Sequence, residues 1–174
     1  MCVEFQNKGT YEALKEQISI IYAQAYFTSG DFDNFDFKVQ GDQKVGNINI
    51  DGDWPLLMIS KSPKYQEYLY DNIMTEQFQQ ELMVESWGRP YLDPTCNITY
   101  DTIDVKTVRL PNGDTWKDTQ DHSKWAVTNS ADVGCICDIN RMHSQLTKGG
   151  SCLCLKDTVL GEALSDIIGT TDTC

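Results

Sequence analysis

The sequence predicts an α+β fold in which an N-terminal amphipathic helix packs on an antiparallel sheet, with further short helices and a disulfide-linked hairpin. Three observations support this prediction: a helical apolar period near the N-terminus, a β-rich stretch after Pro94, and two Cys-x-Cys segments. The chain has 174 residues, of which 40% are hydrophobic, and this is the size of one domain. We therefore expect a single domain over residues 1–174.

The first helix is expected between Tyr11 and Phe27, because apolar side chains recur there every three or four residues. These side chains are Tyr11, Leu14, Ile18, Ile21, Tyr22 and Ala25. Polar residues occupy the opposite face, and Ser29-Gly30 is a typical stop signal. The pattern predicts a helix with one buried face.

Two more helical stretches are predicted further along the chain. Residues 62–88 keep a helical apolar spacing, with an expected break near Asp71 and a stop at Gly88. Residues 157–169 form the last, with Asp157 as the N-cap and Gly169 as the stop.

The strands are predicted mainly in the second half. Residues 44–50 alternate enough to form one short strand, and residues 97–110 are rich in Thr, Val and Ile, as strands are. Pro111-Asn112-Gly113-Asp114 is a strong turn signal, and Trp125–Val127 is a further strand. Short connections of this kind favour an antiparallel sheet.

The cysteines are the strongest signal in the sequence. There are seven of them: Cys2, Cys96, Cys135, Cys137, Cys152, Cys154 and Cys174. In an antiparallel hairpin the register that places Cys135 opposite Cys154 also places Cys137 opposite Cys152, with all four side chains on one face. This geometry favours two stacked disulfides. A four-thiolate zinc site and free thiols in a cytosolic core are the alternatives.

Three cysteines lie outside this pattern. Cys2 and Cys174 are at the termini and Cys96 is in the middle of the chain. A third bridge is expected to hold one terminus while one thiol stays unpaired, and the sequence does not say which. Disulfides place the protein outside the cytosol, in an extracellular or periplasmic compartment.

The composition argues against two classes of partner. The formal net charge is −12, which repels phosphate backbones and anionic headgroups, so nucleic acid and membrane surfaces are not expected as partners. No run of 18 apolar residues occurs, and the N-terminus lacks the basic and apolar regions of a signal peptide. We therefore expect that a targeting or anchoring segment precedes this sequence in the precursor.

An aromatic segment, Trp87-Gly88-Arg89-Pro90-Tyr91, precedes the predicted sheet. Together with the leading helix and the long connection, it resembles type IV pilins and the pseudopilins of type II secretion. In that family a Trp-Gly-x-Pro-Tyr segment commonly leads into the sheet. The Gly and Pro form a sharp turn that lets the Trp and Tyr pack on helix and sheet, as an ordinary aromatic turn also would.

This resemblance implies a structural or adhesive subunit of an extracellular filament, with like subunits as partners. Contact with the membrane would come only through an apolar N-terminal helix that this sequence lacks. A secreted disulfide-rich ligand-binding or host-interaction module is the alternative from a different class. A small secreted hydrolase using two carboxylates is a third reading.

No catalytic residue is predicted. The chain has two histidines. Asp118 and Asp121 precede His122, and Ser123 follows it, but neighbours in sequence rarely form a triad, which is assembled from separate elements. His143 lies in the polar loop between the cysteine pairs, where an exposed side chain is the default. We therefore expect a protein without enzymatic activity.

Calcium is the ligand that the acidic residues could hold, and no other cofactor is expected. Two oxygen clusters have the required ligand chemistry. They are Asp31, Asp33 and Asp36, and Asp114, Asp118 and Asp121. The resemblance favours the second cluster, because some pseudopilins bind calcium in a loop late in the sheet.

Overall fold

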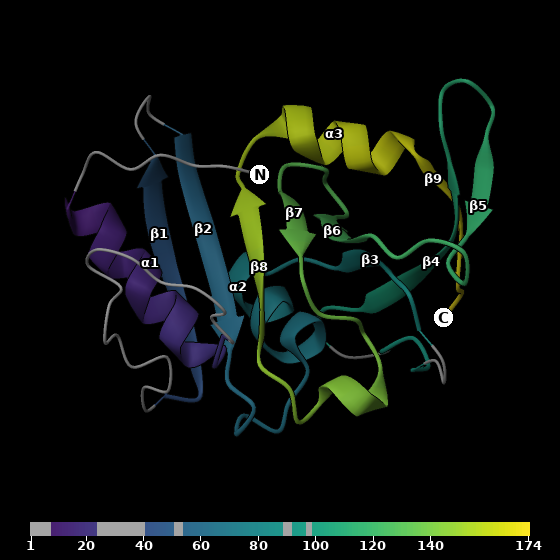
Figure 1. Ribbon diagram of the computed structural model, residues 1–174. Helices are drawn as coiled ribbons and strands as arrows, with labels where there is room; N and C mark the ends of the chain where they lie inside the picture. Colours follow the sequence, from purple (N-terminus) through teal and green to yellow (C-terminus); the bar gives the residue numbers. More distant parts are fainter. Residues whose placement is uncertain (1–7, 24–40, 51–53, 89–91, 97–98) are drawn as a thin grey trace.

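The computed structural model describes residues 8–23, 41–50, 54–88, 92–96 and 99–174 (Figure 1). Its helical elements are α1 (Lys8–Ile20), the π-helix η2 (Leu69–Met74), α2 (Thr75–Phe78), the 3-10 turn η3 (His143–Gln145) and α3 (Thr158–Asp166). Its strands are β1 (Gln43–Ile50), β2 (Trp54–Lys61), β3 (Leu82–Ser86), β4 (Thr102–Arg109), β5 (Thr115–Lys117), β6 (Lys124–Thr128), β7 (Gly134–Cys137), β8 (Gly150–Leu155) and β9 (Ile168–Thr171).

The strands form one mixed sheet of nine strands. The order is β1-β2-β8-β7-β6-β3-β4-β5, and β9 pairs with β4. The β3–β4 pair is parallel, whereas the other pairs are antiparallel. The expectation of an antiparallel sheet is therefore wrong. The parallel pair follows from the long connection at residues 87–101, since a tight turn would have reversed the chain.

The N-terminal helix covers only one end of this sheet. Figure 1 shows α1 beside β1 and β2, where Ala13 and Leu14 pack on a small core cluster. The expected pilin-like helix across the sheet is therefore wrong. The helix also ends at Ile20, earlier than predicted, and Tyr22 adopts a left-handed φ of 56°. An apolar period shows that one face is buried but not which strands bury it.

Two other helices pack on opposite faces of the central strands. On the face that carries α1, α3 packs over β6, where Leu164 contacts the cluster around Trp125 and Val127. On the opposite face, η2 places Leu69 and Tyr70 in the main core. The sheet is thus sandwiched between helices.

The second predicted helix is mostly not an α-helix in the structure. Its centre is the π-helix η2 followed by a single turn of α2, which ends at Gln79 with a left-handed φ of 55°. Residues 82–86 are the strand β3, with Leu82 and Val84 fully buried. A short continuous apolar run fits helical spacing and a buried strand equally well, and here the residues form the strand.

The structure contains three disulfides. Cys135–Cys154 and Cys137–Cys152 link β7 to β8, in the antiparallel register that the cysteine spacing predicted. The third, Cys96–Cys174, ties the last residue of the chain to the segment before β4. Cys2 lies outside the described residues. Because these cysteines are paired, they neither bind zinc nor remain free thiols, and both alternatives are wrong. The disulfides indicate an oxidising compartment.

None of the helices in the described part of the chain has the length and hydrophobicity needed to cross a bilayer.

Candidate active site

The connection between β5 and β6, residues 118–123, turns back onto the end of β3. Lys124 at the start of β6 pairs with Ser86 at the end of β3. This register brings His122 beside Trp87, and their rings stack with centroids 5.1 Å apart and planes inclined by 21°. We define the His122 site as the five residues Glu85, Trp87, Asp121, His122 and Lys124.

Hydrogen bonds fix the turn that carries His122. The Nζ of Lys124 donates to the carbonyl oxygen of His122 over 2.6 Å, and the Ser123 amide donates to Oδ1 of Asp121 over 2.8 Å. The His122 side chain is exposed, so a substrate in solution can reach its ring. An imidazole can transfer a proton or attack an electrophile, and a nearby ammonium can hold an anion. The turn therefore carries an imidazole and an ammonium two residues apart in sequence.

Glu85 lies beneath this turn as a buried carboxyl. It is 0% exposed, and neither carboxyl oxygen has a hydrogen-bond partner among the residues that the structure describes. Burial is the main cause that raises the pKa of Glu85 to about 8. The carboxylates of Asp121, Asp118 and Asp104 raise this pKa further, in that order, and the ammonium of Lys106 lowers it. Glu85 is thus predominantly protonated at pH 7.

An open groove of about 480 Å³ adjoins the 118–123 connection. Its lining includes Lys106, Lys117 and Asp118. Lys106 forms ion pairs with Asp118 over 3.3 Å and with Asp172 over 3.1 Å. Asp118 therefore links the groove to the start of the turn that carries His122.

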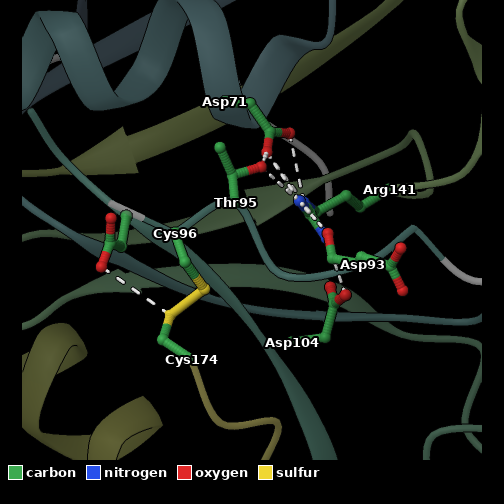
Figure 2. The surroundings of a disulfide bond; sticks show 8 residues. Asp71, Asp93, Thr95, Cys96, Asp104, Arg141 and Cys174 are labelled. Atoms are coloured by element: carbon green, nitrogen blue, oxygen red, sulfur yellow. Dashed lines mark hydrogen bonds and ion pairs between the residues drawn. A yellow bond between two sulfur atoms is a disulfide. The ribbon is translucent and has the colours of Figure 1, made fainter. Parts of the chain in front are cut away.

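A second polar cluster surrounds the buried side chain of Arg141 (Figure 2). Arg141 donates to Asp71 over 2.7 Å and to Asp104 over 2.7 Å, and its side chain is only 1% exposed. The same guanidinium reaches the hydroxyl of Thr95 over 2.8 Å and the carbonyl of Asp93 over 3.1 Å. Burial raises the pKa of Asp104 to about 6, even though Arg141 opposes this shift.

This Arg141 cluster holds segments together that are distant in the chain. It connects η2, the segment before β4, and β4 itself, and Figure 2 shows the Cys96–Cys174 disulfide close by. Each nitrogen of the guanidinium donates to a protein atom, so the cluster has the character of a structural tie and not of a substrate site. Its role is to hold β4, which neighbours β3, in place.

The three carboxylates predicted to bind calcium have separate partners. Asp114 is exposed in the β4–β5 turn and accepts a hydrogen bond from Nδ2 of Asn112 over 2.8 Å. Asp118 pairs with Lys106, and Asp121 holds the turn before β6. Within the described ranges, no three His, Cys, Asp or Glu side chains are grouped so that they could hold a metal ion. Asp31, Asp33 and Asp36 lie outside those ranges.

The other predicted residues have different fates. Trp87 is half-buried and stacks on His122, and Gly88 is buried, whereas Pro90 and Tyr91 lie outside the described residues. His143 is exposed, as expected, and its Nδ1 lies 2.8 Å from the hydroxyl of Tyr68. Sequence reasoning missed Lys124 and Glu85. The spacing His-x-Lys directly before a predicted strand was the signal that could have found Lys124.

Comparison with known proteins places the chain in a family. The family model described as Deoxyribonuclease II matches residues 1–174. Plancitoxin-1 of Acanthaster planci is 33% identical over 132 residues, which is 74% of this chain and 37% of that protein. A protein of Burkholderia pseudomallei named putative deoxyribonuclease-2 is 32% identical over 143 residues, covering 78% of this chain and 37% of the relative.

Deoxyribonuclease-2 of Caenorhabditis elegans is also similar, with 32% identity over 142 residues that cover 79% of this chain and 37% of the relative. The chain belongs to the Deoxyribonuclease II family. It spans a little over a third, 37%, of the length of these relatives.

Family membership overturns several expectations. The resemblance to pilins is wrong, and so are the filament or adhesion subunit and the ligand-binding module derived beside it. The expectation of a protein without enzymatic activity is also wrong, because the relatives are named as nucleases. The same names contradict the exclusion of nucleic acid as a partner. A five-residue aromatic motif was too short to identify a family, and net charge says nothing of the field at one site.

Proposed function

We propose that this chain contributes a catalytic site for the hydrolysis of phosphodiester bonds in DNA, with His122 as the reacting group and Lys124 as the phosphate anchor. The observation behind the proposal is a turn in a member of the Deoxyribonuclease II family that carries an exposed His122 stacked on Trp87 and a Lys124 ammonium bonded to the backbone carbonyl of His122. The three disulfides support an extracytoplasmic place of action, outside the cell or in a secretory compartment.

The chemistry needs both groups at one phosphate. The Lys124 ammonium holds a nonbridging phosphate oxygen and offsets its charge as the phosphorus becomes five-coordinate. In one route a nitrogen of the His122 imidazole attacks the phosphorus, the P–O bond to the leaving oxygen breaks, and water then hydrolyses the P–N bond. In the other route water attacks the phosphorus while the protonated imidazole gives its proton to the leaving oxygen as the P–O bond breaks. Both routes require the ring to stay oriented. Stacking on Trp87 restricts the ring, and the 2.6 Å bond from Lys124 keeps the ammonium at the same turn.

The test compares DNA cleavage by the wild-type chain with that by His122→Ala and Lys124→Ala. His122→Ala is expected to lose about 100-fold or more in rate, and Lys124→Ala about tenfold or more, in line with the loss of a reacting group and of an anion contact. His143→Ala is the matched control, because it removes the chain's other histidine, which is bonded to Tyr68, and it should keep full activity.

The outcomes decide whether the proposal holds and whether His122 acts as the nucleophile or as the proton donor. Equal rates for wild type and His122→Ala, or a wild-type chain that does not cleave DNA, would overturn the proposal. Acid-labile label on the protein after reaction with a phosphorus-labelled substrate would identify His122 as the nucleophile, since phosphohistidine hydrolyses in acid. An active chain without such label would identify proton transfer.

A further inference from the structure

Glu85 is a buried acidic residue whose position packing alone does not explain. It sits in β3 next to Val84, which is fully buried, and it is itself 0% exposed. Neither of its oxygens has a hydrogen-bond partner within the described part of the chain. A buried charge without a partner destabilises a fold, and an apolar side chain would fill this strand position better. The carboxyl therefore calls for an explanation other than packing.

The surroundings of Glu85 are acidic on two sides. The 118–123 connection contributes Asp121 and Asp118, and β4 contributes Asp104 and Lys106. Lys106 is already paired with Asp118. Trp125, directly opposite on β6, carries no charge. A negative charge on Glu85 would face three carboxylates and one shared ammonium, so the folded site favours the neutral acid.

The position of Glu85 connects it to His122 through β3. Side chains two residues apart in an extended chain point to the same face, so Glu85 and Trp87 share a side of β3 and its continuation. Trp87 stacks on His122, and Asp121 directly precedes His122. The acidic turn can thus lie against β3 while the carboxyl below it is uncharged. Because Glu85 is fully buried, it cannot touch a substrate and can act only through its neighbours.

We propose that Glu85 is a positioning residue of the His122 site: as a neutral acid it lets the 118–123 turn rest on β3 and hold His122 against Trp87, and as an anion it repels that turn. This inference deepens the proposed nuclease function and rests on it for its effect on rate. It predicts that deprotonation of this one buried carboxyl causes the loss of cleavage rate at alkaline pH. The pKa of about 8 places this limit just above neutrality.

The experiment compares wild type with Glu85→Gln, which keeps the shape and stays neutral at every pH. Glu162→Gln is the matched control, because it removes the same charge from an exposed position on α3. If rate follows the protonated fraction of a group with a pKa of about 8, the wild-type rate falls about tenfold from pH 7 to pH 9. Relative to wild type, Glu85→Gln should gain about tenfold over that interval, and Glu162→Gln should not change.

A second readout does not depend on activity. With His143→Ala as background, His122 is the remaining imidazole of the two in the sequence, and its ring-proton NMR signal can be followed from pH 5 to 10. The signal should show a step near pH 8 in addition to the titration of His122 itself. This step should be absent in Glu85→Gln and present in Glu162→Gln. If the nuclease proposal failed, this measurement would still decide the role of Glu85.

Superimposable NMR and rate profiles for wild type and Glu85→Gln would overturn the inference. If circular dichroism shows that Glu85→Gln does not fold, carbon-13 labelling of the glutamate carboxyls in wild type replaces it. One carboxyl signal should then titrate near pH 8 together with the His122 signal. Titration of every glutamate near its ordinary pKa would overturn the inference equally.

Discussion

Replacing Arg141 by Met should remove the internal tie and leave two buried carboxylates without their cation. The side chains of Asp71 and Asp104 are only 7% and 11% exposed, and both accept hydrogen bonds of 2.7 Å from the guanidinium. Breaking a buried ion pair from one side costs about 3–5 kcal/mol, because the remaining charge stays desolvated. Arg141→Met should lose about this much free energy of unfolding at pH 8.

The loss should be smaller at pH 5. The pKa of Asp104 is raised to about 6 even with Arg141 in place, so without the cation this carboxyl takes up a proton more readily. A folded-state pKa that is raised adds stability at low pH, and that stability is lost as the pH rises through the raised pKa. Arg141→Met therefore destabilises least in acid.

Urea unfolding followed by tryptophan fluorescence at pH 5 and pH 8 measures both quantities, since the chain has four Trp. Arg109→Met is the control, because Arg109 is exposed at the end of β4 and its loss should cost under about 0.5 kcal/mol. If Arg141→Met matches this control at both pH values, the cluster does not stabilise the fold and the reasoning fails.

Three further predictions concern stability and use the same unfolding assay. Removing the Cys135–Cys154 bridge with two Ala substitutions should cost less than the about 3 kcal/mol of an isolated loop of this length, because Cys137–Cys152 still closes nearly the same loop. Asp157→Ala should cost about 1 kcal/mol, since the Asp157 carboxylate caps α3 by accepting from the Val159 amide. Glu85→Gln should gain stability over wild type as the pH rises from 4.5 to 8, by at most about 5 kcal/mol, because the wild-type carboxyl must remain protonated when buried.

Local signals in the sequence predicted local structure well. The Cys135–Cys154 and Cys137–Cys152 bridges that the cysteine spacing favoured are present in the structure, and so are the Asp157 cap and the strand at Trp125. Each depends on residues that are close in sequence or related by a single hairpin. The parallel pairing of β3 with β4 was missed, because it depends on where a 15-residue connection returns, and no local pattern encodes that.

The site was harder to predict than the fold. The sequence places His122 close to Asp118, Asp121 and Ser123, and because sequence neighbours rarely form a triad, no catalytic role was predicted for it. Trp87, which stacks on His122, follows β3, and Glu85 lies within that strand. The pairing of β3 with β6 brings these two residues to the turn, and no local pattern encodes that pairing. The spacing His122-x-Lys124, by contrast, is a local signal that was missed.

The charge of the chain leads to a last prediction about DNA. A net charge of −12 repels a phosphate backbone at long range, yet a bound phosphate responds mainly to groups within about 8 Å at physiological salt. Near the His122 site Glu85 is neutral, and the charge of Asp118 is offset by its ion pair with Lys106. The positive charge of Lys124 is therefore available to attract a phosphate. Long-range repulsion and local attraction thus act on different steps.

Raising salt from about 10 mM to about 150 mM should increase kcat/KM for DNA cleavage, because screening removes the repulsion that slows encounter. A protein that binds DNA through a basic surface shows the opposite slope. A fall in kcat/KM over this range would mean that attraction between the protein and DNA extends well beyond Lys124.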